Sequence, residues 1–213
     1  MKDMLGTLVR RIVNLPLEML GTICDLIEKL SSEAGQQWLA ELKKFLRKEN
    51  CWTGIVAIKD AYLKLISSGQ ALVIDACDGA NVLADAKDVF AHIDPDFKNW
   101  KADQRGFASG ETFVEVYEMK KDGTFSQMFG SLSPDLQKLC LTQDQIIGFV
   151  KKHREWLRTD GYGTFFLFMS NEQYFVAGVL FSGALLSVDV YRFEGSDGWY
   201  AGSHHRVVVP QLV

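Results

Sequence analysis

The aspartates between residues 69 and 96 are the first side chains in this sequence whose types and spacing could do chemistry together. This stretch holds six acidic residues and a single base, Lys87. Asp75 ends an apolar run typical of a buried strand, and ligand sites in α/β sheets favour the carboxyl ends of strands. Mg²⁺ and Mn²⁺ take oxygen ligands. One hypothesis is therefore a metal-dependent hydrolase or nuclease whose divalent-metal site uses Asp75, Asp78, Asp94 and Asp96.

The same aspartates also suit structural roles. Asp78-Gly79 is an ordinary turn signal, and the sequence 94–96 has the composition of a loop. The acids between them fall on the polar face of a predicted helix. The metal site requires that this helix folds back, so that the four carboxylates meet in one cleft.

A shorter pattern resembles the sequence motif of two-metal nucleases, in which an aspartate precedes Glu-x-Lys on the next strand. Asp96 and Glu118-Met119-Lys120 supply these residues. Residues 118 and 120 would share a face of one strand, as a metal ligand and a water-orienting base require. Short degenerate patterns also arise by chance in 213 residues, and Asp96 falls in a predicted loop.

Basic side chains form the other candidate site, for an anion or an RNA phosphate. His204 and Arg206 would share one face of a strand and could meet Tyr191 or Arg192 of the preceding strand. A second basic group ends a predicted helix, and aromatic residues of the neighbouring sheet could stack bases. The residues of this hypothesis are Lys151, Lys152, Arg154, His204 and Arg206. A polar sheet margin, and bases that favour the helix dipole, explain the same residues without a ligand.

Motifs of other enzyme classes are absent from the sequence. It has no GxSxG, Walker A or GxGxxG pattern. The cysteines are far apart and have no CxxC or nearby-histidine spacing, so a zinc finger or ribbon is disfavoured. We expect reduced thiols in a cytoplasmic protein, although the sequence leaves the redox state open for Cys24, Cys51, Cys77 and Cys140.

The elements that would position these residues begin with a helical region, expected over 1–66. Apolar residues recur every three or four positions in 4–13, 17–30 and 38–46, which predicts three amphipathic helices. We expect Ser32 to cap the third of them. A fourth helix is predicted over 57–66, and 67–69 is the candidate linker. No stretch of 18 apolar residues predicts a membrane span, and bases that follow the first apolar run argue against a secretory signal.

Residues 67–213 are expected to form an α+β domain. Strands are predicted at 71–75 and 113–119, helices at 82–92 and 125–132, and a long loop at 94–111. Thr142 with Gln145 has capping-box spacing at the start of a helix over 142–158. Four closely spaced runs, 164–169, 174–181, 185–193 and 199–209, predict a four-stranded antiparallel meander packed against two or three helices.

Composition agrees with a folded chain and narrows its partners. Hydrophobic residues make up 47% of the chain, charged residues 23%, and the net charge is -4. These values exclude a disordered chain and disfavour, without excluding, a nucleic-acid binder. The stretch at 69–96 carries more net negative charge than the whole chain, so the remainder of the chain is close to neutral.

Two stretches, 38–49 and 141–146, the second continuing to 161–168, resemble hypothetical proteins of uncultured bacteria that have no known activity. The resemblance is partial and brings no catalytic motif with it.

We interpret the sequence as a non-catalytic binding or protein-interaction module, acting in the cytoplasm with a protein partner or a second copy. Amphipathic helices beside an absence of nucleophile and cofactor motifs favour this interpretation. The alternatives are the metal-dependent hydrolase or nuclease and the RNA-binding protein described above. No cofactor is expected, apart from a divalent metal under the first alternative.

Overall fold

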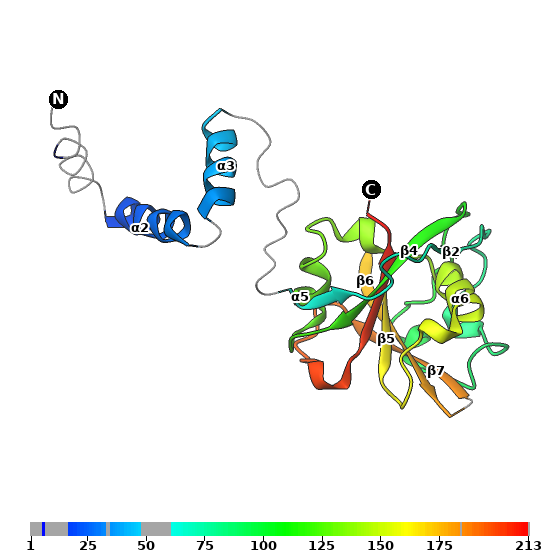
Figure 1. Cartoon of the computed structure of the whole chain (residues 1–213). Helices are drawn as coiled ribbons and strands as arrows, with labels where there is room; N and C mark the ends of the chain where they lie inside the picture. Colours follow the sequence, from blue (N-terminus) through cyan, green and yellow to red (C-terminus); the bar gives the residue numbers. More distant parts are fainter. Residues whose placement is uncertain (1–5, 7–16, 33–34, 48–60, 184, 213) are drawn as a thin grey trace. The chain divides into compact units, whose positions relative to one another are not determined.

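The computed structural model describes residues 6, 17–32, 35–47, 61–183 and 185–212 (Figure 1). Contacts divide the chain into two compact units, Met1–Ile58 and Lys59–Val213. The helix expected over 4–13, apart from Gly6, and the segment 48–60 lie outside the described residues.

The described part of the first unit consists of two helices, α2 (Leu17–Ser31) and α3 (Gly35–Leu46). Both were predicted from their apolar periodicity. The residues that directly precede α3, 33–34, lie outside the described part of the chain, so the expected cap by Ser32 stays a prediction; the Ser32 hydroxyl donates to the carbonyl of Lys29 at 2.7 Å, at the end of α2. Gly35 packs tightly against the Leu30 carbonyl, where a Cβ would lie only 2.1 Å from the oxygen.

The second unit is built on one mixed sheet of eight strands, in the order β1-β4-β8-β5-β6-β7-β3, with β2 also paired to β4. Two pairs, β5–β8 and β3–β7, are parallel and the others are antiparallel. The strands are β1 (Leu63–Leu65), β2 (Leu72–Ile74), β3 (His92–Ile93), β4 (Thr112–Met119), β5 (Gly163–Ser170), β6 (Gln173–Ser182), β7 (Leu185–Arg192) and β8 (Arg206–Pro210). This unit has the expected α+β class.

The predicted meander holds for three strands and fails at the fourth. Strands β5, β6 and β7 follow one another as antiparallel neighbours. Residues 199–209 do not extend this series, because Trp199 bridges to Gly123 and a short 3-10 turn, η4 (Ala201–Ser203), follows. Strand β8 then lies between β4 and β5 and runs parallel to β5 (Figure 1). A parallel neighbour needs a crossover, and the chain between β7 and β8 provides it.

Two predicted helices are replaced by other structure. Residues 63–65, expected in a helix over 57–66, form strand β1 against β4. Residues 82–92, expected as a helix, form a 3-10 turn, η1 (Leu83–Asp85), and end in the edge strand β3. The predicted loop 94–111 contains one short helix, α4 (Asp96–Asn99). In these segments contacts with the sheet outweigh local helix propensity.

Both faces of the sheet are covered, so its central strand is apolar on both sides. On one face α6 (Gln143–Lys152) packs Phe149 against Phe166, with ring centroids 5.5 Å apart. On the other face α5 (Phe125–Gly130) packs Phe125 against Phe165, at 5.0 Å. Neighbouring residues of β5 thus enter opposite cores, as expected for a strand buried on two sides.

Candidate functional site

The first two of the four candidate metal-binding aspartates have local partners. Asp75 is exposed and pairs with the ammonium group of Lys152. The Asp78 carboxylate accepts the backbone N–H of Ala80 at 2.9 Å, the hydrogen bond of an ordinary Asx turn. Both contacts belong to the surface next to β2.

Of the other two aspartates, Asp94 bonds to an edge of the sheet and Asp96 lies within α4. Asp94 donates its backbone N–H to the Val188 carbonyl at 2.9 Å, and its carboxylate accepts the N–H of Val190 at 3.3 Å. Asp94 therefore extends the hydrogen bonding between β3 and β7 beyond the end of β3, through its backbone N–H and its carboxylate. Asp96 accepts from the Asn99 amide within α4 at 2.8 Å. Burial raises the pKa of the neighbouring Asp189, and Asp94 adds to this effect.

The structure does not gather these carboxylates into a metal site. Among the described residues, no three His, Cys, Asp or Glu side chains are grouped so that they could hold a metal ion. Asp75, Asp78, Asp94 and Asp96 all lie in the described part of the chain. Each carboxylate instead contacts a base, a turn, a strand edge or a neighbouring helix residue.

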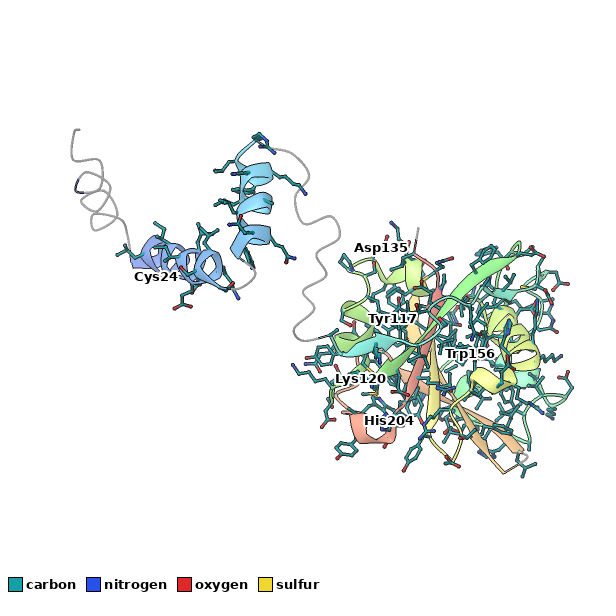
Figure 2. The ribbon with its side chains drawn as sticks, viewed as in Figure 1. Cys24, Tyr117, Lys120, Asp135, Trp156 and His204 are labelled. Carbon is teal, nitrogen blue, oxygen red and sulfur yellow. The ribbon has the colours of Figure 1, made fainter. Side chains whose placement is uncertain are left out.

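The two residues of the Glu-x-Lys pair lie at the end of β4, where Lys120 directly follows the strand, and they contact each other. Lys120 donates to Glu118 at 3.2 Å, and the His204 ring lies 3.3 Å from the same carboxylate oxygen (Figure 2 labels Lys120 and His204). Burial opposes ionisation of Glu118, yet Lys120 and His204 hold its pKa below the usual value. This cluster joins the end of β4 to the turn before β8.

The basic residues of the anion or RNA hypothesis are separately engaged. Lys151 pairs with Asp88 at 2.8 Å, while the Arg154 guanidinium lies 5.7 Å from the centre of the Phe181 ring. Arg206 donates through Nη1 to the carbonyls of Trp156 at 2.9 Å and Leu157 at 3.3 Å. Lys152 and His204 pair with acids as described above. These bases therefore lie on several elements, and most of them contact carboxylate or carbonyl oxygens of the same chain.

A buried histidine that the sequence did not single out, His205, lies directly before β8. His205 Nδ1 accepts the backbone N–H of Gly163 at 3.0 Å. The rings of Phe165 and Trp199 each lie 5.2 Å from the imidazole. Burial lowers the pKa of His205, and the Arg158 guanidinium acts in the same direction. The adjacent pair in 204–205 was visible, but which of the two faces the core depends on the turn before β8.

The start of α6 is a second polar centre, of which the sequence predicted only the cap. Thr142 and Gln145 form the expected capping box. The buried Asp144 carboxylate accepts from the Gly79 N–H at 3.0 Å and from the Asn81 amide at 2.9 Å. Gln143 accepts the Leu83 N–H at 3.0 Å. Two successive polar residues, Gln143 and Asp144, therefore tie the 79–83 segment to α6, which is a structural rather than a chemical role.

One cavity of about 190 Å³ lies beside this polar centre. Its lining contains both signs of charge, from Arg105 and Lys151 on one hand and Asp85 and Asp88 on the other. The salt bridge between Lys151 and Asp88 spans two of these groups. The cavity thus presents balanced charge and no convergent set for an anion or a cation.

The helical unit presents apolar side chains that are not buried. We define the apolar stripe as the side chains that share one face of each helix by their three- and four-residue spacing: Leu20, Ile23, Ile27 and Leu30 of α2, with Trp38, Leu42, Phe45 and Leu46 of α3. Ile27 is 53% exposed, Phe45 63% and Leu46 70%, and the other members are half-buried. None of the hydrophobic side chains described in this unit is buried.

Contacts between α2 and α3 occur where the chain turns from one to the other. The Lys29 ammonium lies 5.7 Å from the centre of the Trp38 ring, and Gly35 packs on the Leu30 carbonyl. These contacts leave much of the apolar stripe accessible.

In comparisons with known proteins, no family model matches the chain, and neither does any curated protein or solved structure. None of the described helices has the length and apolar character needed to cross a membrane. Cys24, Cys77 and Cys140, the cysteines in the described part of the chain, are free. Burial raises the pKa of the Cys140 thiol to about 12.

Proposed function

We propose that this chain is a non-catalytic protein-interaction module whose docking element is the helical unit. The observation that carries the proposal is the apolar stripe, which is left exposed or half-buried along both described helices. Burying one Leu, Ile or Phe side chain is worth about 1.5–3 kcal/mol. A partner that covers this stripe would therefore gain a substantial apolar contact.

The lengths of the helices support the same conclusion. α2 has 15 residues and α3 has 12. Isolated helices shorter than about 12–15 residues are marginal in water, and helices in proteins gain most of their stability by packing an apolar face. Helices of this length, without a buried side chain among those described, need another surface to become firmly folded.

The α+β unit supports a non-catalytic role through the contacts of its polar groups. The carboxylates and bases considered for metal or phosphate chemistry form turns, strand edges and ion pairs, as with Asp94 at β7 and Lys152 at Asp75. We assign to the α+β unit the role of a stable domain to which the docking helices are attached.

The proposal is tested by placing the photo-crosslinking residue benzoyl-phenylalanine at Phe45 in the full chain. The matched control places it at Gln36, which is exposed and lies half a turn away from Phe45 on α3. We expect crosslinks from position 45 to an identified peptide of another protein molecule, and few from position 36. Equal yields from both positions, or crosslinks from position 45 only to lipid or to the chain's own α+β unit, would contradict the proposal.

A further inference from the structure

We propose that Arg158 and Arg206 of the α+β unit together form a binding site for a phosphate group. This site goes beyond the interaction function proposed above and involves neither α2 nor α3. Guanidinium groups suit phosphate because their planar donors can engage two oxygens at once. Three features of the two side chains favour such a site: they are adjacent, they are held in fixed positions, and bases predominate around them.

Contacts with each other's neighbours in the chain bring the two guanidinium groups together. Arg206 donates through Nη1 to the carbonyls of Trp156 at 2.9 Å and Leu157 at 3.3 Å (Figure 2 labels Trp156). These carbonyls belong to the two residues directly before Arg158. The Nε–H of Arg158 in turn donates to the carbonyl of Ser203 at 3.3 Å, three residues before Arg206. Burial lowers the pKa of Arg206, and the nearby positive charge of Arg158 acts in the same direction.

The same contacts hold both side chains in place and leave donors for a ligand. The backbone N–H of Arg158 donates to Thr164 Oγ1 at 2.7 Å, and its guanidinium carbon lies 5.3 Å from the centre of the Tyr162 ring. Its Nη1 is 3.9 Å from the exposed carboxylate of Asp160, which is beyond hydrogen-bond distance. Within the described part of the chain, Nη2 of Arg158 and Nη2 of Arg206 donate to no protein acceptor. These groups are therefore available to phosphate oxygens.

Bases predominate around the two guanidinium groups, although the α+β unit as a whole contains more acids than lysines and arginines. Strand register places Arg206 beside Glu118 of β4, and Glu118 beside Lys64 of β1. The Glu118 carboxylate already contacts Lys120 and His204. It therefore neutralises only part of the positive charge at this end of the sheet. A local excess of positive charge on an acidic domain attracts anions to that place.

Titration calorimetry of the full chain with inorganic phosphate tests the site, with chloride keeping the ionic strength constant. We expect one phosphate per chain, with a Kd of about 1 mM or tighter. Arg158→Gln should weaken binding by about tenfold or more, because it removes one of the two guanidinium groups. The matched control is Arg154→Gln, with the same change of charge, since Arg154 of η3 (Arg154–Trp156) contacts the Phe181 ring instead. Absence of saturable phosphate binding, or equal weakening by the two substitutions, would overturn the inference.

The imidazole of His205 provides a second measurement, which needs no variant. Burial lowers the pKa of His205, and the positive charge of Arg158 adds to this effect. A phosphate bound to Arg158 offsets that charge, so the pKa of His205 followed by NMR should be higher in phosphate than in chloride of equal ionic strength. The same pKa in both salts would count against a phosphate at Arg158.

Comparison of inorganic phosphate with glycerol 2-phosphate distinguishes the two sources of a phosphate group. Tighter binding of inorganic phosphate supports a site for the free ion. Tighter binding of the ester supports a site for a phosphorylated molecule. In either case Arg158→Gln should weaken binding and Arg154→Gln should not, and the reverse order of the two variants would overturn the assignment to Arg158 and Arg206.

Discussion

The imidazole of His205 joins the starts of two neighbouring strands through a single hydrogen bond. Its Nδ1 accepts the N–H of Gly163, the first residue of β5, and aromatic rings enclose it on several sides. An acceptor role requires the lone pair of Nδ1, so this contact favours the neutral ring. A protonated ring would lose the contact and face the positive charge of Arg158.

We predict that acid weakens the fold through His205. Its native pKa lies below that of an unfolded histidine, about 6.5, so the unfolded chain takes up the proton first as the pH falls. The free energy of unfolding therefore increases with pH from the native pKa up to about 6.5 and levels off above it for this group. Urea unfolding at about pH 5 and about pH 7.5 measures the difference, which His205→Asn should reduce because asparagine does not titrate.

The neighbouring His204 supplies the control for this measurement. It is exposed and lies beside Glu118 rather than in the core. His204→Asn should retain the part of the pH dependence that His205→Asn removes. Identical pH dependence in the unmodified chain and in His205→Asn would show that the Gly163 contact is not coupled to protonation.

The candidate side chains could be found in the sequence, but their partners could not. The aspartates of 69–96 were visible as an acidic run, and their local turn chemistry was a stated alternative. The contact of Asp94 with β7 depends on a strand pairing between residues nearly one hundred positions apart. Residue spacing carries no record of such a pairing.

At the level of elements, the N-terminus of α6 holds the irregular segment beside it. Asp144 is only 7% exposed and accepts two hydrogen bonds, from the Gly79 N–H and the Asn81 amide. Gly79 has a positive φ of 75°, and a Cβ there would lie 2.5 Å from the Phe107 carbonyl oxygen. The Asp144 carboxylate thus holds the turn at Gly79 in place, and the backbone at Phe107 passes close to this turn.

We predict that Asp144→Ala destabilises the domain by about 2–4 kcal/mol, because it leaves buried donors without an acceptor. Chemical unfolding monitored by tryptophan fluorescence measures the loss. Asp85→Ala is the matched control, since Asp85 is exposed and pairs with the exposed Lys98 at the surface; its cost should stay below about 1 kcal/mol. Equal effects of the two substitutions would contradict the structural role of Asp144.

Elements with their own end signals were predictable, and elements defined by the sheet were not. The capping residues Thr142 and Gln145 identified the start of α6, although the helix ends at Lys152 rather than near 158. Residues 63–65 and 82–92 have helical periodicity without such signals. There the edge of β4 and the packing of η1 decide the conformation. Local pattern is a weak guide where a sheet edge offers backbone partners.

The whole molecule combines a folded domain and a helical unit with different requirements. The sheet domain buries aromatic residues on both faces, and its α+β class could be predicted from strand spacing and composition. The insertion of β8 between β4 and β5 could not, because it depends on the left-handed turn at His204, where φ is 52°. The helical unit was visible in sequence as amphipathic helices, whereas the exposure of the side chains described on α2 and α3 required the structure.

The central claim is that the apolar stripe of α2 and α3 becomes buried when the chain binds another protein molecule. Hydrogen–deuterium exchange of the full chain, alone and in complex with the protein that crosslinks to position 45, tests it most directly. The amides of 17–31 and 35–46 should become more protected in the complex, while those of β5 stay unchanged, and Phe45→Ser should abolish the gain. Exchange in the two helices that is the same in the free and bound chain, or that slows equally in Phe45→Ser, would contradict the claim.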